Sequence, residues 1–311
     1  MNSSVGVLLL TLNAEKHLHD CLLPVINSTL KPKVLVIDSS SQDKTAEIAK
    51  DFGAEVLIIQ KNEFNHGATR ERGRKLLNTD IVVFQTQDAY PMDETMLNKL
   101  VAPIQESKSE IAYGRQIPHD SSGLFESFPR EFNYPLMSNL RSIRDVQKYG
   151  VYTFFNSHSW AAYLNSALDK AGGIEIMLSS EDYFTTAKML NEGFKIAYVS
   201  ESIVKHSHRY NLIQEFKRYF DTGYVRKKYP WVNEIVGQAE TRGSKLLGAL
   251  LKRTAGENPV MLPYAIFSSI VKWLGFRIGY FGSGLPVWMK KKLSGQPYYW
   301  DSIYYKERND R

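Results

Sequence analysis

The chain has 311 residues, of which 43% are hydrophobic and 23% are charged, and its formal net charge is +6. This composition excludes a disordered chain and allows one large domain with a full core plus an appendage. The positive charge favours anionic partners, among them nucleotide diphosphates, nucleic acid and acidic lipids. The single cysteine, Cys21, excludes an intramolecular disulfide framework and is typical of a reducing compartment, where we expect it to be buried as a small apolar residue.

The first part of the chain alternates apolar runs of strand length with helix-compatible segments. The first run has no cationic flank or cleavage pattern, so it predicts a strand and not a signal peptide. Alternation of this kind predicts an α/β fold of Rossmann-like type, with a largely parallel sheet, right-handed crossovers and flanking helices. The expected strands are 5–10, 33–37, 55–59 and 81–84, and the expected helices are 14–27, 44–52 and one ending at Leu77.

Beyond residue 88 the pattern is less regular. A helix is expected over 93–106 and a strand over 111–114, whereas 116–151 is irregular and rich in aromatic and charged residues. Long irregular segments inside α/β enzymes are often substrate loops. The pattern returns with the apolar run 154–163, a helix over 181–193, a strand over 195–199 and a helix over 211–228.

A domain boundary is expected between Tyr229 and Ser244, which divides the chain into 1–230 and a helical region over 231–311. The strongest membrane candidate is 259–288. Prolines and the charges of Lys272 and Arg277 interrupt the charge-free run of roughly 20 residues that a spanning helix needs, so we expect no span. Its aromatic and basic residues suit a membrane interface, and a hairpin packed on the preceding α/β domain or an oligomerisation surface explains these residues equally well.

Polar side chains follow three of the expected strands. Ligands in open α/β sheets bind beyond the carboxyl ends of the strands, so these residues predict one crevice. Asp38 can accept hydrogen bonds from a nucleobase or a ribose, or it is an ordinary turn acid. Asp88 can hold Mg²⁺ or Mn²⁺ that bridges a diphosphate, because these ions prefer oxygen ligands.

The loop 63–70 opens a helix. Gly67 would let the backbone approach a ligand, the helix start offers free N–H groups, and Arg70 can pair with phosphate. A solvated loop without a ligand could have the same sequence pattern. No Gly-x-Gly-x-x-Gly motif and no Walker loop occurs, so dinucleotide binding and phosphoryl transfer are not indicated.

Two later clusters carry acid and imidazole groups. Glu181 and Asp182 open a helix, where acids favour the helix dipole, and where one of them could also act as a general base. His206 and His208 alternate along an extended segment, so one of them, for preference His206, is expected to join Asp88 at a metal.

Together these motifs resemble the inverting family 2 glycosyltransferases of the GT-A fold, and more narrowly the bacterial rhamnosyltransferases that use dTDP-L-rhamnose. The resemblance covers most of 5–210 and continues more loosely to the end. It rests on the order and spacing of Thr11-Leu12-Asn13-Ala14-Glu15, the segment from Val36 to Asp43, the segment from Glu63 to Arg70, Gln85-Thr86-Gln87-Asp88-Ala89, Glu181-Asp182 and His206-Ser207-His208.

The resemblance implies a role for each matching residue. Asp182 corresponds to the general base, and Thr86-Gln87-Asp88 corresponds to the family's Asp-x-Asp motif without its first carboxylate. Donor contacts are expected from Thr11, Asn13, Glu15, Asp38, Ser40, Asn65, Gly67, Arg70, Gln87 and Asp88, metal contacts from Asp88, His206 and His208, and acceptor or phosphate contacts from Glu181, Trp160 and Arg218.

The implied reaction moves L-rhamnose from dTDP-β-L-rhamnose to a hydroxyl of a growing surface glycan or lipid-linked saccharide, in a single displacement assisted by Mg²⁺ or Mn²⁺. The implied location is the cytoplasm, either free or on the inner face of the cell membrane. Two alternatives stay open, a transferase for a UDP-hexose or another dTDP-sugar and a catalytically silent subunit that binds nucleotide sugars. Nucleic-acid binding is not expected, because the Lys and Arg residues are scattered and no recognition motif occurs.

Overall fold

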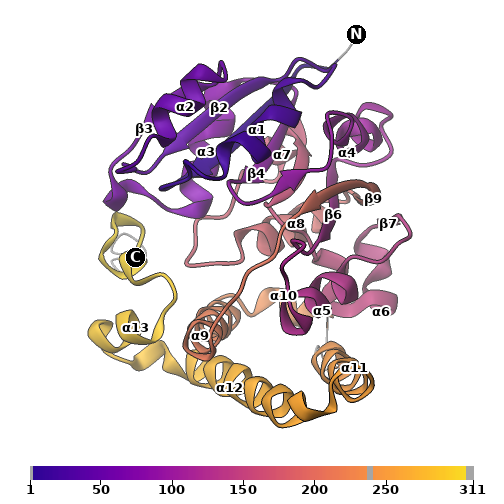
Figure 1. Cartoon of the computed structure of the whole chain (residues 1–311), viewed down its shortest axis with the longest axis vertical. Helices are drawn as coiled ribbons and strands as arrows, with labels where there is room; N and C mark the ends of the chain where they lie inside the picture. The colour runs from indigo at the N-terminus through magenta and orange to yellow at the C-terminus, as the bar shows by residue number, and fades with distance from the viewer. Residues whose placement is uncertain (1–2, 237–240, 306–311) are drawn as a thin grey trace.

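The structure is a computed structural model that describes residues 3–236 and 241–305. Its centre is one nine-stranded sheet with strand order β3-β2-β1-β4-β8-β6-β9-β5, and β7 pairs with β9 (Figure 1). The strands are β1 (Val5–Thr11), β2 (Lys33–Asp38), β3 (Glu55–Ile58), β4 (Ile81–Thr86), β5 (Tyr90–Pro91), β6 (Ile111–Ile117), β7 (Asn139–Arg141), β8 (Trp160–Leu164) and β9 (Ile196–Lys205).

The first four long strands form a parallel half-sheet, as the alternating pattern predicts. β1 pairs with β2 and β4, and β2 pairs with β3, all in parallel. Every residue of β1 is buried, because helices cover both faces, and this explains its unbroken apolar run. The helices of this half are α1 (Leu18–Ile26), α2 (Thr45–Asp51) and α3 (His66–Leu77). The first begins later than expected because Ala14 to His17 form a turn.

The other half of the sheet is mixed, whereas the sequence predicted a largely parallel arrangement. β8 lies between β4 and β6 and is antiparallel to both, β6 and β9 are parallel, and β5 and β7 run antiparallel to β9. The direction of β8 follows from where the chain enters it. The excursion over 118–159 delivers the chain to the carboxyl end of β4, where Trp160 pairs with Gln85.

The segment 116–151, which the pattern left irregular, contains regular structure. It completes β6 and includes α5 (Leu124–Asn133), β7 and the short helix α6 (Val146–Tyr149). Arg141 at the end of β7 is fully buried and donates hydrogen bonds to the carbonyls of Tyr152 and Phe155 and to the hydroxyl of Tyr113. The apolar run 154–163 is a strand only from Trp160 onward.

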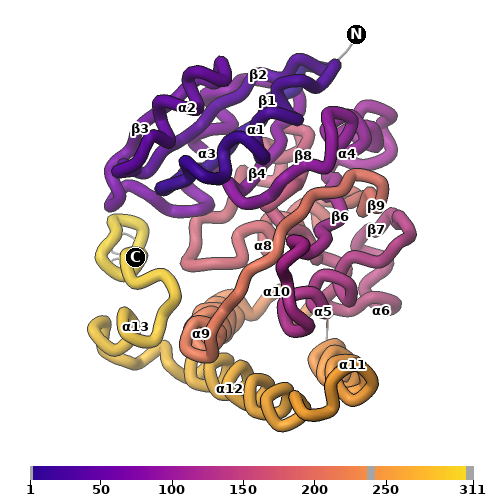
Figure 2. Tube along the Cα trace, viewed as in Figure 1, coloured from indigo at the N-terminus to yellow at the C-terminus, as the bar shows by residue number. Residues whose placement is uncertain are grey.

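The C-terminal elements wrap around the lower edge of the molecule and return to the sheet domain (Figure 2). Tyr299 and Trp300, far along the chain, belong to the same buried cluster as Phe220 of α9 and Leu8 of β1. The remaining helices are α4 (Met96–Gln105), α7 (Asn165–Lys170), α8 (Glu181–Asn191), α9 (Leu212–Lys228), α10 (Trp231–Val236), α11 (Thr241–Glu257), α12 (Leu262–Phe281) and α13 (Val287–Leu293).

Helix α12 packs along α9 at very short range. A Cβ atom built on Gly279 would lie 2.0 Å from the carbonyl oxygen of Phe220, and one on Gly275 would lie 2.4 Å from that of Phe216. Real Cβ atoms essentially never come this close to a backbone atom. The glycines therefore let the two backbones touch.

By length and composition, Pro259–Gly284 is the one segment in the described part of the chain that could cross a membrane, and only 17% of its most apolar stretch is buried. It lies lengthwise against α9, where Lys272 forms an ion pair with Glu215 at 3.2 Å. Its glycine face meets α9, so its large apolar side chains point outward.

We predict that Gly279→Ala lowers the free energy of unfolding by about 1–3 kcal/mol, because the added methyl group must push α12 away from α9. Urea denaturation followed by circular dichroism measures the change. Gly248→Ala in α11 is the control, since a Cβ there meets nothing within 4 Å and should be neutral or stabilising by about 0.5–1 kcal/mol. Equal effects of the two changes would contradict the packing argument.

Candidate active site

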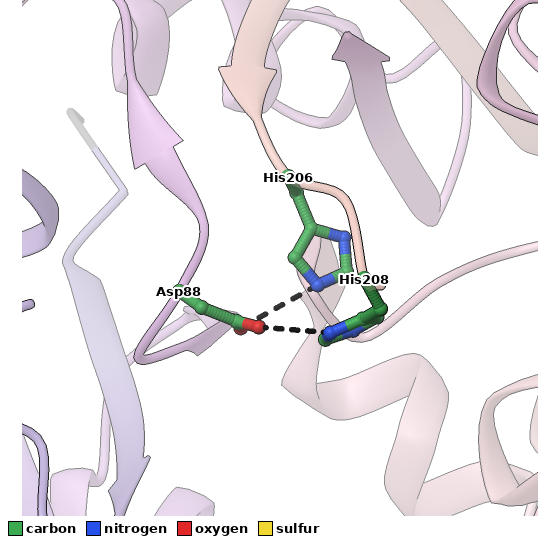
Figure 3. A group of neighbouring side chains, drawn as sticks. All are labelled: Asp88, His206 and His208. Atoms are coloured by element: carbon green, nitrogen blue, oxygen red, sulfur yellow. Dashed lines mark ion pairs between the residues drawn. The ribbon is translucent and has the colours of Figure 1, made fainter. Parts of the chain in front are cut away.

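Asp88, His206 and His208 form a compact group beyond the ends of β4 and β9 (Figure 3). Asp88 Oδ1 lies 3.4 Å from His206 Nε2, and Asp88 Oδ2 lies 3.4 Å from His208 Nδ1. One ligand atom from each residue fits within 4.8 Å of the other two. Both histidines face the carboxylate, although alternation along an extended segment predicted only one.

The sheet explains why residues so distant in sequence meet here. The two residues of β5 pair antiparallel with the end of β9, so that Tyr90 lies opposite Lys205. This pairing places the turn that carries Asp88 beside His206. The backbone N–H of His206 in turn binds the carbonyl of Ile117 at the end of β6.

The donor set fits a divalent cation. Two ligands that each lie about 2.1 Å from one ion are separated by roughly 3.0–3.4 Å, close to the Asp–His distances here. Gln116 accepts a hydrogen bond from His206 Nδ1 at 2.9 Å, which leaves the Nε2 lone pair facing Asp88. A partner on the second ring nitrogen is the usual way in which proteins orient a metal-binding histidine.

Electrostatics at this group favour an anionic carboxylate and neutral imidazoles. Burial alone would raise the pKa of Asp88, but the hydrogen bond from His206 and the positive charge that either histidine carries when protonated hold it well below its usual value. Burial lowers the pKa of His206, and burial together with His206 lowers the pKa of His208 to about 4. These are the protonation states in which Asp and His bind metals.

A second polar group lies at the start of α8. Arg70 of α3 donates to Glu181 Oε1 at 2.8 Å, and both side chains are buried. His158 Nδ1 lies 3.5 Å from the same oxygen, while its Nε2 lies 2.9 Å from the hydroxyl of Tyr163. Although burial would raise it, the pKa of Glu181 is held below its usual value by His158 and the Arg70 charge.

Asp182 has the opposite character. Burial, followed by the negative charge of Glu181, raises its pKa to about 7. Its carboxylate accepts hydrogen bonds from the backbone N–H groups of Tyr183 and His158. Neighbouring acids with such different pKa values are typical of sites where one carboxylate supplies charge and the other transfers a proton.

The backbone that enters α8 is unusual. Ser180 has φ of +64°, and its side chain makes no capping hydrogen bond to the helix. Asn13 and Ser40, at two predicted donor-binding turns, also adopt positive φ. Left-handed non-glycine residues are uncommon and cluster at functional sites.

A cavity of about 210 Å³ joins Asp182 to the end of β4. Thr86 lies on its wall, so the cavity that contains Asp182 reaches to within two residues in sequence of Asp88, which does not itself line the cavity. The cavity is lined by His66, Arg70, Thr86, Ser157, His158, Ser159, Ser179, Ser180, Glu181, Asp182 and Gln296.

The predicted donor residues of the first two strands are linked to one another. Asp38 is buried and accepts hydrogen bonds from Thr11 Oγ1 at 2.9 Å and from the backbone N–H of Ser41 at 2.9 Å. Asn13 Oδ1 accepts from the backbone of Gln42, and Glu15 accepts from that of Lys44. Ser40 Oγ donates to the carbonyl of Ile59.

Three predicted donor-binding residues have structural roles in this fold. Asn65 is buried, caps α3 by accepting from Gly67 and Ala68, and donates to the carbonyl of Met177. A Cβ on Gly67 would lie 2.0 Å from the Glu175 carbonyl oxygen, so packing alone requires the glycine. The amide of Gln87 bridges both backbone groups of Leu12 and thereby ties the end of β4 to the end of β1.

Four further predictions need correction or stay open. Arg70 and Glu181 pair with each other at 2.8 Å and both line the cavity, so their predicted diphosphate and acceptor contacts stay predictions. Trp160 is 1% exposed and donates to Ser202, which excludes an acceptor contact. Arg218 is exposed, lies over the Tyr210 ring and pairs with Glu215, and its predicted phosphate role stays a prediction.

Sequence reasoning missed several residues of the site. His158 and Gln116 lie in or near segments without a recognisable motif, and Gln296 comes from the C-terminal region that was assigned to a membrane or oligomer surface. Arg130 of α5 contributes positive charge that lowers the pKa of both His206 and His208. The aromatic and charged composition of 116–151 was the one signal that pointed to this region.

Known proteins resemble this chain over most of its length. The sequence model of the family described as "Glycosyl transferase family 2" matches residues 7–172. The O-antigen chain rhamnosyltransferase RfbN of Salmonella typhimurium is 33% identical over 305 residues, which cover 97% of each chain. The O-antigen chain rhamnosyltransferase WbaN of Salmonella anatum is 34% identical over 275 residues, covering 88% of this chain and 87% of the relative.

Solved structures of low sequence identity share the fold. The mannosyltransferase PcManGT from Pyrobaculum calidifontis, in complex with GDP-Man and Mn²⁺, superposes with a TM-score of 0.63 at 15% identity, covering 91% of this chain and 88% of that one. A fragment of S. aureus TarS in complex with UDP-GlcNAc gives a TM-score of 0.56 at 15% identity, with coverages of 89% and 90%. The fold is therefore GT-A, and the chain is a glycosyltransferase that belongs to glycosyl transferase family 2.

Proposed function

We propose that this glycosyltransferase moves L-rhamnose from dTDP-β-L-rhamnose to a hydroxyl of a surface glycan, with inversion at the anomeric carbon. The observation that carries the chemistry is the difference in pKa between two neighbouring acids. Asp182 borders the cavity and its pKa is raised to about 7, whereas the pKa of Glu181 is lowered, so that Glu181 stays an anion. The full-length similarity to two O-antigen chain rhamnosyltransferases supports the choice of sugar and the glycan acceptor.

In the proposed reaction, Asp182 accepts the proton of the acceptor hydroxyl as that oxygen bonds to the anomeric carbon and the bond to the diphosphate breaks. The negative charge of Glu181 makes Asp182 a better base than an isolated aspartate. Arg70 and His158 keep Glu181 ionised and hold the start of α8 in place. A base in this position typically contributes ~10²–10⁴-fold to the rate.

At the other end of the site, Asp88, His206 and His208 would hold the cation. A bound Mg²⁺ or Mn²⁺ offsets the charge that develops on the departing diphosphate. The segment Thr86-Gln87-Asp88 lacks the first carboxylate of the family's Asp-x-Asp motif. The two histidines would compensate for it, because with Asp88 they bring the number of protein ligands to three. Arg130 adds positive potential on the same side, in place of Arg70, which is paired in the interior.

We also propose that the protein works at the inner face of the cell membrane, on a lipid-linked acceptor, and docks there through α12. Its outward face exposes large apolar side chains, with Trp273 60% and Phe281 65% accessible. Between Glu257 and Asp301 the sequence has no Asp or Glu but five Lys or Arg residues. An apolar face with tryptophan and a basic surround fits the interface of a membrane that contains anionic lipids.

Arg277 supports this orientation of the helix. It is the one charged residue on the outward face, and its guanidinium lies over the Trp273 ring at 5.8 Å and the Phe281 ring at 4.9 Å. A long cationic side chain stacked on interfacial aromatics can reach lipid phosphates while its stem stays apolar. The other basic residue of the helix, Lys272, faces α9 and pairs with Glu215.

We predict that dTDP-L-rhamnose with Mn²⁺ raises the melting temperature more than UDP-glucose, UDP-galactose or GDP-mannose do, because a ligand that binds only the folded state stabilises it. Asp88→Asn should remove most of the Mn²⁺-dependent part of this shift. Asp51→Asn, at an exposed position in α2, should leave it unchanged. Equal shifts with and without chelator in the parent protein would refute the metal assignment.

We predict that Asp182→Asn lowers kcat by about 10²–10⁴-fold, since asparagine cannot accept the proton, while the thermal shift with the donor persists. In the parent enzyme the rate should rise with pH through about 7, because only the ionised form of Asp182 is a base. Release of nucleoside diphosphate in the presence of acceptor measures both. A variant that retains a rate within a few-fold of the parent's would show that another group is the base.

We predict that the protein floats with vesicles that contain anionic phosphatidylglycerol and not with vesicles of phosphatidylcholine alone, and that added salt weakens the association. Trp273→Glu should abolish flotation, because a carboxylate would enter the interface. Met137→Glu is the control, since Met137 is 80% exposed but lies far along the chain from α12. If both variants still float, or if the parent forms a dimer through this face and stays in solution, the docking proposal fails.

A further inference from the structure

The C-terminal segment after α13 supplies a residue to the catalytic cavity. Gln296 lines it together with Asp182 and Ser180, although more than a hundred residues separate them in sequence. The rest of the segment is anchored in the catalytic part of the protein. Tyr299 and Trp300 are buried in its main core, and Tyr304 donates to the carbonyl of Glu63.

A buried carboxylate fixes the backbone at this point. Asp221 of α9 is 3% exposed and accepts a hydrogen bond from the N–H of Gly295 at 2.9 Å. The hydroxyl of Ser294 also interacts with this carboxylate, and the N–H of Gln296 donates to Ser294 Oγ at 2.9 Å. A side chain on α9 therefore determines where the backbone of Gln296 lies.

The side chain of Gln296 is oriented as well. Tyr298 donates its hydroxyl hydrogen to Gln296 Oε1 at 3.0 Å. With the oxygen engaged, the amide presents its Nε2 hydrogens, and no hydrogen bond from them to another described residue is formed. Tyr298 is in turn held against Phe64, with ring centroids 6.0 Å apart.

We infer that Gln296 is a specificity-determining residue that donates a hydrogen bond to a hydroxyl of the acceptor sugar. This inference rests on the proposed function of the cavity. The acceptor is the substrate that must reach Asp182, and Gln296 shares a cavity with Asp182, whereas Asp88 and its two histidines do not line that cavity. Asp221 and Tyr298 act as positioning residues, because they set the backbone and the amide orientation of Gln296.

The test uses the full chain, Mn²⁺ and the octyl glycosides of galactose, glucose, mannose and rhamnose as acceptor probes, followed with the best of the four. Gln296→Ala should raise the acceptor KM by about tenfold while kcat changes less than about threefold and the donor thermal shift is unchanged, because the lost interaction binds the acceptor. Gln147→Ala is the matched control, since Gln147 is exposed on α6.

The positioning residues give a graded response. Tyr298→Phe should raise the acceptor KM by a smaller factor than Gln296→Ala does. Asp221→Leu should raise the acceptor KM as much as Gln296→Ala. Asp221→Asn keeps an oxygen that accepts hydrogen bonds, so it should retain most of the affinity for the acceptor. Limited proteolysis of the C-terminal segment reports whether Asp221→Leu releases it. An unchanged acceptor KM in Gln296→Ala, or an equal loss of donor binding, would overturn the inference.

This outcome is separable from a failure of the proposed function. If dTDP-L-rhamnose is not a donor, the acceptor KM ratio between Gln296→Ala and the parent is measured with whichever nucleotide sugar is turned over. If none is, saturation-transfer NMR with the same octyl glycosides compares their binding to the two proteins directly. A loss of the saturation-transfer signal in Gln296→Ala alone would support the role of Gln296, and equal signals would reject it.

Discussion

The buried ion pair between Arg70 and Glu181 is the constraint on which the catalytic end of the molecule depends. It joins α3 to α8, and His158 adds the strand region before β8 to the same contact. Buried charges are stable only when they are paired, so loss of either partner would leave an uncompensated charge in the interior. After burial, the same negative charge is what raises the pKa of Asp182, so one ion pair both holds α3 to α8 and sets the protonation of the neighbouring acid.

The first half of the fold was predictable from the sequence, because the strands Val5–Thr11, Lys33–Asp38 and Ile81–Thr86 are buried on both faces and their apolar runs are unbroken. The second half of the sheet, with its mixed strand directions, was not predictable. The direction of β8 depends on the path of the preceding excursion, and that path is held by tertiary contacts such as those of buried Arg141. No local periodicity records contacts of this kind.

The candidate site shows the same division. Asp88 and His206 converge as expected because they follow strand ends, and strand ends meet at one edge of a sheet, whereas His208 joins them against the expected alternation. At the start of α3, Asn65 and Gly67 satisfy capping and packing requirements that look in sequence like ligand binding, so the sequence pattern does not distinguish the two roles. Gln296 could not be found, because only the folded return of the C-terminal segment brings it to Asp182.

The glycine contact between α9 and α12 has a geometric consequence. The residues that follow His208 lead directly into α9, and α9 is held rigidly against the helix that carries the outward apolar face. If that face rests in a bilayer, the reacting centre stands at a constant height above the lipid headgroups. Such an enzyme would select its substrate by length. It would act on saccharides whose growing end reaches that height above the membrane and not on longer ones.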